Sequence, residues 1–192
     1  MKTVLLIPGF KEDFRTRDYT AVISAIEAKG YKVKFVDINW KRTTIENWVD
    51  QLNFVYTSHK PEDTVLAGFS YGAMTAFVAA TQRNPLELWL FSLSSYFTED
   101  IKSVHMKKSW LRNIGHRRVS AFDALNFTEL AKEIDCKTLL FIGQKELDMW
   151  PDMRTRFLAA GKLLKDSTLV TVGDVGHDVA DPRYIRSILE AI

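Results

Sequence analysis

A Gly-X-Ser-X-Gly motif is the strongest chemical signal in this sequence. It spans residues 68–72 and places Ser70 between two glycines. The motif follows a buried strand pattern, Thr64–Gly68, and precedes an alanine-rich helix pattern, Tyr71–Gln82. A serine on a sharp strand-to-helix turn needs small residues two positions away, and the helix points its free N–H groups at charge that develops beside it. The motif predicts Ser70 as a nucleophile. The alternative is a plain turn with a satisfied serine.

A serine hydroxyl becomes a good nucleophile only when a base removes its proton. His177 lies in a glycine-rich turn, residues 173–178, directly after the last strand pattern. That turn leaves its imidazole at the carboxyl edge of the sheet, where Ser70 also lies. We therefore expect His177 to be the general base, against the alternative of a structural turn histidine. The other histidines lie at a helix end or in an irregular basic stretch: His59, His105 and His116.

Strand-length apolar runs alternate with helical patterns along the chain, which predicts an α/β fold. The runs lack strict polar–apolar alternation, as expected for a parallel sheet with helices on both faces. We expect a doubly wound, mostly parallel sheet of about six strands flanked by helices. The expected strands are Lys2–Ile7, Lys32–Ile38, Thr64–Gly68, Leu86–Ser92, Thr138–Ile142 and Thr168–Val172. The expected helices are Tyr19–Lys29, one after a Thr43–Glu46 capping pattern, Tyr71–Gln82, one after a Ser120–Asp123 capping pattern, Pro151–Lys165 and Pro182–Ile192.

Length and composition exclude several classes of protein. The chain has 192 residues, 46% of them hydrophobic and 26% charged, with a net charge of +2. These values predict a single globular domain over residues 1–192, and the charge is too small to indicate nucleic-acid binding. No apolar run is long enough for a membrane helix. The lone Cys136 predicts a reducing cytoplasm. The sequence leaves the oligomeric state open.

With these residues in this order, the chain resembles the α/β-hydrolase superfamily. The resemblance covers nearly the whole length: a strand ending in Ile7–Phe10, the turn at 68–72, a penultimate strand followed by acids, and a last strand followed by Gly176-His177. The order of nucleophile, acid and histidine is also the family's. The first strand matches the family's third, so the usual amino-terminal hairpin is missing, and so is the large helical lid of many lipases. The resemblance implies a compact, minimal member.

The resemblance also implies a carboxylate that orients the histidine. Two candidates, Glu146 and Asp148, follow the strand pattern Leu139–Gly143. Counting from the strand favours Glu146, at the position where the family most often keeps its acid. Counting back from His177 favours Asp148. Because strand ends restrict positions more than loop lengths do, we lean to Glu146 and leave Asp148 open.

The remaining parts of the expected site are oxyanion donors and pocket walls. By resemblance, the backbone N–H groups of Phe10 and Tyr71 bind the oxyanion of a tetrahedral intermediate. Aromatic side chains near the carboxyl ends of the strands are expected to line an apolar pocket. Such side chains also close cores, so the sequence does not separate the two roles. The candidates are Phe14, Trp40, Tyr96, Phe97, Trp110 and Trp150.

These features predict a serine hydrolase of the carboxylesterase type. We expect it to cleave an ester or thioester of a small apolar or aromatic acyl group through an acyl-enzyme, without metal or organic cofactor. The alternative is a binding or receptor module with the same fold and little turnover. An irregular basic excursion at about 93–119 has two interpretations, a solvated loop or a small flap over the site.

Overall fold

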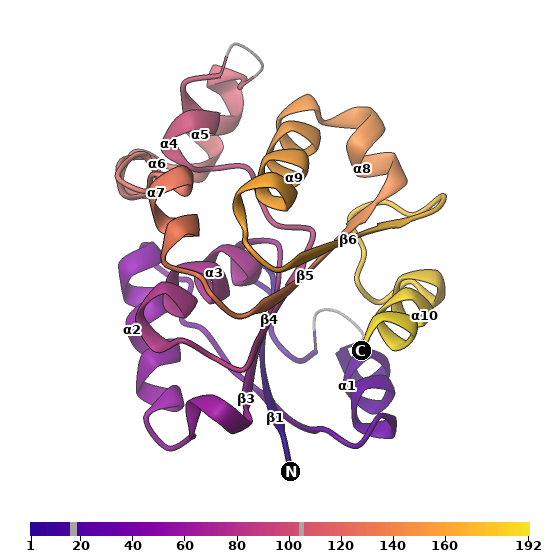
Figure 1. Ribbon diagram of the computed structural model, residues 1–192. Helices are drawn as coiled ribbons and strands as arrows, with labels where there is room; N and C mark the ends of the chain where they lie inside the picture. The colour runs from indigo at the N-terminus through magenta and orange to yellow at the C-terminus, as the bar shows by residue number, and fades with distance from the viewer. Residues whose placement is uncertain (16–18, 104–105) are drawn as a thin grey trace.

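The computed structural model describes residues 1–15, 19–103 and 106–192. Within these ranges, parallel strands form one sheet with the order β2-β1-β3-β4-β5-β6. The expected parallel, doubly wound architecture is confirmed (Figure 1). The strands are β1 (Thr3–Ile7), β2 (Lys32–Phe35), β3 (Thr64–Phe69), β4 (Glu87–Phe91), β5 (Lys137–Gly143) and β6 (Ser167–Val172). Strand β2 thus ends before the expected Ile38.

Helices fill the connections and cover both faces of the sheet (Figure 1). Among the described residues, no helix is both long and apolar enough to cross a membrane. The helices are α1 (Tyr19–Ala28), α2 (Ile45–Tyr56), α3 (Tyr71–Arg83), α4 (Thr98–Ile101), α5 (Lys108–Ile114), α6 (His116–Asp123), α7 (Phe127–Lys132), α8 (Gln144–Met149), α9 (Pro151–Leu163) and α10 (Pro182–Ala191).

The two faces of the sheet build two separate apolar cores. Alternate residues of each strand point to opposite faces. In β1, for example, Leu5 and Ile7 join the core under α2, α3, α7 and α9, whereas Val4 and Leu6 join the core under α1 and α10. Both cores are closed by fully buried aromatic rings, which include Trp48 on one face and Trp89 on the other. A sheet buried on both faces explains why the strand patterns are continuously apolar.

The segment 93–119 is more regular than the sequence indicates. Instead of an irregular excursion it contains α4, α5 and the start of α6, while residues 104–105 lie outside the described ranges. The helix expected to begin at Ser120 is also wrong, because α6 already includes that residue. A new helix, α7, begins after Asn126, whose side chain accepts a hydrogen bond from the Glu129 N–H at 2.9 Å. Because Asn126 caps a new helix start, α7 is a separate helix from α6.

The start of α2 differs from its predicted capping pair. The Asn47 side chain accepts from the Thr44 N–H at 3.2 Å, so the capping residues are one position later than Thr43 and Glu46. Thr43 is used elsewhere, because its hydroxyl accepts a hydrogen bond from Trp48 Nε1 at 2.8 Å. A buried indole N–H needs such a partner. Thr43 therefore contacts Trp48 and does not cap the helix.

Candidate active site

Ser70 occupies a strained turn between β3 and α3. Its φ of 57° and ψ of −115° are uncommon for a residue with a side chain. The turn brings main-chain segments so close together at Gly68 and Gly72 that there is no room for a side chain at either position. A methyl group on Gly68 would overlap the Gly72 carbonyl, and one on Gly72 would overlap the carbonyls of Ile7 and Pro8. Both glycines of the motif are therefore sterically required, and the turn lifts the Ser70 hydroxyl to the edge of the sheet.

The strand order explains why this edge gathers functional groups. The chain runs from β1 outward to β2 and then returns to β3 on the other side of β1. Loops diverge at such a reversal and leave a crevice beyond the carboxyl ends of the strands. Ile7 is paired with Gly68 in the sheet, and Phe10 and Tyr71 each lie three residues after their member of this pair. Their rings contact each other with centroids 4.9 Å apart.

The main-chain N–H groups near Ser70 differ in their availability. Tyr71 is the first residue of α3, so no earlier helical carbonyl can accept its N–H. The N–H of Gly9 donates to the Tyr19 hydroxyl at 3.0 Å and to the Glu12 carboxylate at 3.2 Å. These bonds hold the turn after β1, which presents the next residue, Phe10, beside Tyr71. The two residues whose N–H groups the sequence suggests as oxyanion donors therefore lie side by side, with their rings in contact.

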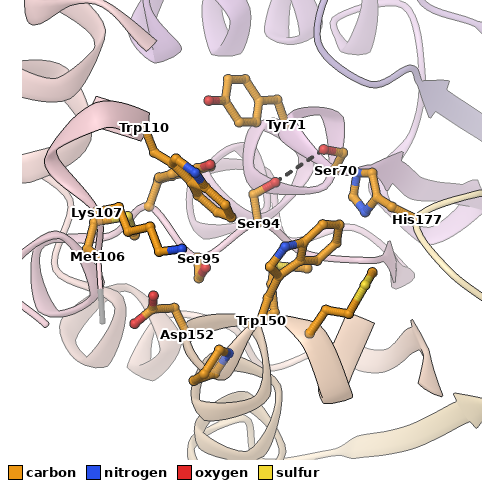
Figure 2. A pocket seen from close by; sticks show the side chains of 14 residues that line it. Ser70, Tyr71, Ser94, Ser95, Met106, Lys107, Trp110, Trp150, Asp152 and His177 are labelled. Carbon is orange, nitrogen blue, oxygen red and sulfur yellow. Dashed lines mark hydrogen bonds between the residues drawn. The ribbon is translucent and has the colours of Figure 1, made fainter. Parts of the chain in front are cut away.

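His177 follows β6 in a turn that packs against β5. A side chain on Gly143 would overlap the carbonyls of Val175 and Gly176, so this turn also depends on a glycine. The imidazole lies between the Phe69 and Trp150 rings, with centroids 4.6 and 5.8 Å away. Figure 2 shows the imidazole beside Ser70 at the rim of the cavity. Both residues line the same hollow.

Glu146, and not Asp148, is the carboxylate that contacts His177. Glu146 is fully buried, and its Oε1 lies 2.6 Å from His177 Nδ1. An ionised carboxylate can only accept, so Nδ1 carries the proton and Nε2 remains an acceptor. Asp148 is exposed and pairs with Arg154 at 3.2 Å. Helix α8, which the sequence analysis did not predict, begins directly after β5 and turns these two acids to opposite sides.

The Glu146 carboxylate has further partners. Its Oε2 accepts from the Gly143 N–H at 2.8 Å and from the Ser92 hydroxyl at 2.7 Å. The Ser92 oxygen in turn lies 3.1 Å from the Tyr184 hydroxyl. Burial, reinforced by the nearby Glu146 charge, raises the pKa of Tyr184 well above its usual value, so this phenol keeps its proton. Sequence analysis missed Ser92 and Tyr184.

The Ser70 hydroxyl has its own hydroxyl neighbour. Its Oγ lies 3.2 Å from Ser94 Oγ, and both side chains are buried (Figure 2). Ser94 and Ser95 follow β4, whose carboxyl end lies beside that of β3. Their place directly after a predicted strand was a usable signal, although serine alone does not distinguish a site from a turn. Sequence analysis missed both residues.

A cavity of about 400 Å³ opens next to Ser70 and His177. Its walls combine aromatic and thioether side chains with a few polar groups, a composition typical of sites for small apolar ligands. Trp110 from α5 meets Trp150 at a centroid distance of 6.4 Å. The lining residues that the sequence analysis did not name are Ser94, Ser95, Met106, Lys107, Met149, Pro151, Asp152 and Met153.

The structure brings three of the six predicted wall residues to the cavity. Tyr96, Trp110 and Trp150 line the cavity, and so does Tyr71. Burial raises the pKa of Tyr71 and Tyr96, whose hydroxyls are hydrogen-bonded to each other, so both remain protonated. The hydroxyl that accepts within this pair keeps its own proton for another acceptor.

Three predicted wall residues lie elsewhere. Phe97 is buried in the core between the rings of Phe77 and Phe127. Trp40 packs on Trp48 and donates from Nε1 to the Glu12 carbonyl at 3.2 Å. Phe14 is 46% exposed and contacts Phe35, at the far side of β1. Each of these residues follows a strand, as expected. The direction of its side chain, however, depends on local turns that the sequence pattern does not reveal.

Comparisons with known proteins find similarity in structure rather than in sequence. No protein-family model matches the chain, and neither does any curated protein sequence. Est1E from Butyrivibrio proteoclasticus superposes with a TM-score of 0.79 at 18% identity, over 99% of this chain and 84% of that one. Carboxylesterase CesB from Bacillus subtilis gives a TM-score of 0.69 at 15% identity, over 98% and 82%. MGS-MChE2, an α/β hydrolase from a lagoon-sediment metagenome, gives 0.67 at 16%, over 98% and 89%.

The chain has the α/β-hydrolase fold. In this α/β-hydrolase fold, Ser70, Glu146 and His177 follow β3, β5 and β6, so the chain presents a serine, a carboxylate and a histidine in that order at one edge of the sheet. Helix α5 contributes Trp110 to the cavity, and Lys107, the residue before α5, also lines it (Figure 2). Part of the segment 93–119 is therefore cavity wall rather than a solvated loop alone.

Proposed function

We propose that the protein is a serine hydrolase that cleaves carboxylic esters or thioesters of a small apolar or aromatic acyl group. The main support is one juxtaposition: Ser70, on a turn with positive φ, shares a cavity with His177, whose Nδ1 lies 2.6 Å from buried Glu146. A binding module has no need for a strained serine next to an oriented imidazole. That combination is what nucleophilic catalysis requires.

In this mechanism His177 Nε2 takes the Ser70 proton as Oγ attacks the substrate carbonyl carbon. The carbonyl π electrons move to oxygen and give a tetrahedral oxyanion. When the carbonyl re-forms, the bond to the leaving oxygen or sulfur breaks and the imidazolium returns its proton to that atom. Water then repeats the cycle on the acyl-enzyme, releases the acid and restores Ser70. Every step uses Nε2, which the contact between Nδ1 and Glu146 leaves free.

The other groups stabilise charge in this cycle. Glu146 stabilises the imidazolium and holds its tautomer. The N–H groups of Phe10 and Tyr71 bind the oxyanion, each contributing about 3 kcal/mol to the transition state. The N-terminus of α3 adds its dipole at the same place.

The cavity supports an aromatic or short apolar acyl group. Trp110, Trp150 and three methionines are among the residues that line it, and a volume of about 400 Å³ suits a group of that size. Among the similar structures, Est1E has been solved with ferulic acid bound, and another is a naproxen esterase. We extend this acyl preference to the present chain as part of the proposal. We also propose that residues 1–192 act as one domain and, from the single Cys136, that the compartment is a reducing cytoplasm.

A fluorophosphonate probe tests the proposal directly. Wild-type protein should be labelled covalently, and Ser70→Ala should not, with peptide mass spectrometry placing the adduct on Ser70. Ser94→Ala is the matched control, because it removes a neighbouring hydroxyl and keeps the proposed nucleophile. Folded wild-type protein that takes up no label would instead favour a binding module. A panel of p-nitrophenyl and aryl-acyl esters, with matching thioesters, then defines the acyl group.

A further inference from the structure

Two buried hydroxyl groups lie behind the proposed triad and have no part in the steps above. Ser92 follows β4 and Tyr184 lies in α10, so they reach the site from segments 92 residues apart in the chain. Both side chains are fully buried. Ser92 has a φ of 49°, a conformation that residues with side chains seldom adopt. In this conformation its N–H still donates to the Phe141 carbonyl at 2.8 Å, while its hydroxyl reaches Glu146.

The hydrogen bonds among these groups have only one consistent direction. An ionised carboxylate has no proton, so Ser92 donates to Glu146 Oε2 at 2.7 Å. A serine has one hydroxyl proton, so in the 3.1 Å contact between Tyr184 and Ser92 the tyrosine is the donor. The result is a chain of donors from Tyr184 through Ser92 to Glu146 Oε2, while Glu146 Oε1 accepts from His177 Nδ1 at 2.6 Å. Such chains polarise and strengthen one another in a buried site.

We propose that Ser92 and Tyr184 are positioning residues that hold the Glu146 carboxylate and thereby set the proton affinity of the Glu146–His177 pair. The inference rests on the proposed function for its role in catalysis. The expected change in the pKa of His177 does not depend on the proposed function, because it follows from the contacts alone. The two hydroxyls act through Glu146 and touch neither substrate nor Ser70.

The sign of the effect follows from charge. With His177 neutral, the pair carries one negative charge, located on Glu146, and adding a proton neutralises the pair. A donor to Glu146 stabilises the charged form more than the neutral one. Loss of the donor therefore raises the pKa at which the pair takes up its proton, whether the proton resides on the imidazole or on the carboxylate.

Two charged side chains, Lys107 and Asp152, line the same cavity as His177, and the other charged groups near the pair lie in α8, in α10 and in the turn after β6. On α8, Lys145 pairs with Asp174 at 2.9 Å, and Asp148 pairs with Arg154. On α10, Arg183 next to Tyr184 pairs with Asp174 and Asp181. Asp178, beside His177, accepts from the Ala180 N–H at 3.1 Å. These groups are exposed or face solvent, unlike Ser92 and Tyr184, so the variants below leave them unchanged.

The test is the pKa of His177, measured by NMR titration of its imidazole in wild-type protein, Ser92→Ala, Tyr184→Phe and the control Tyr56→Phe. Tyr56 is also a buried tyrosine, but its hydroxyl contacts the Arg83 carbonyl at 3.4 Å, far from the site. A spectrum of His177→Gln assigns the resonance. We expect the pKa to rise by about half a unit to one unit in Ser92→Ala, less in Tyr184→Phe, and not at all in Tyr56→Phe.

Ester hydrolysis gives a second readout. The acid limb of kcat/KM should move to higher pH together with the NMR titration, and kcat at its plateau should fall about tenfold in Ser92→Ala. An unchanged or lowered His177 pKa in Tyr184→Phe, which keeps the ring and its packing, would overturn the inference even if Ser92→Ala failed to fold. A loss of kcat with no movement of the pKa would also overturn it. If His177 shifts as expected but wild-type protein hydrolyses no ester, only the proposed function fails.

Discussion

Replacement of Glu146 by glutamine is the sharpest test of the proposed triad. In the structure, Oε1 of Glu146 faces His177 Nδ1, and Oε2 accepts from both Ser92 and Gly143. Glutamine offers one oxygen and one NH₂ group in the same fully buried space. If the NH₂ group faced Ser92 and Gly143, donors would confront donors, at a cost of about 1–3 kcal/mol for each unsatisfied group. The amide oxygen should therefore take that side.

This orientation gives His177 the wrong tautomer. The NH₂ group of Glu146→Gln would then donate to Nδ1, so the imidazole proton would move to Nε2, which could no longer accept the Ser70 proton. We expect kcat/KM to fall about 10⁴-fold, equivalent to about 5.5 kcal/mol in the transition state. The fold should persist, because the side chain keeps its size and all three hydrogen-bond partners, with only the bond to His177 reversed in direction.

The assay is hydrolysis of a p-nitrophenyl ester, with thermal unfolding of each variant measured in parallel. Asp148→Asn is the matched control, since Asp148 is exposed and contacts Arg154 rather than His177; its kcat/KM should stay within about twofold of wild type. Equal losses in the two variants, or a loss below about tenfold in Glu146→Gln, would refute the assignment of Glu146 as the orienting acid.

Three further predictions address the turn, the cavity and the cysteine. Gly72→Ala, whose methyl group would overlap main-chain carbonyls, should lower the free energy of unfolding in urea by about 3 kcal/mol, whereas Gly173→Ala, which has open space, should change it little. Trp110→Ala should raise KM for aromatic-acyl esters about tenfold, and Phe54→Ala, at an 81% exposed site remote from the cavity, should not. Burial raises the pKa of Cys136 to about 11, so iodoacetamide should label native protein slowly at pH 8 and unfolded protein quickly, as read by mass spectrometry; equal rates would contradict this.

Local sequence patterns carried most of the information about the fold. Buried strands such as β3 and β5 appear as short apolar runs because helices cover both faces of the sheet, and Ser70 and His177 are recognisable because each follows such a run. The capping residues of α2 and the break between α6 and α7 were harder to predict from the sequence. Thr43 accepts from the Trp48 indole instead of capping α2, and Asn126 caps a new helix, so in both cases a competing side-chain contact decided the boundary.

The sequence by itself determined the parallel sheet, the strained serine turn and the histidine at the same edge, because strand and turn preferences act over a few neighbouring residues. Only the tertiary structure decided which acid faces His177, since α8 turns Glu146 inward and Asp148 outward. It also decided that Phe97 and Trp40 belong to the core and Trp110 to the cavity. The contacts of Ser92 with Glu146 and Tyr184 span 54 and 92 residues of chain. Such contacts arise only when separate elements pack, because each local segment is compatible with many side-chain directions until its neighbours exclude all but one.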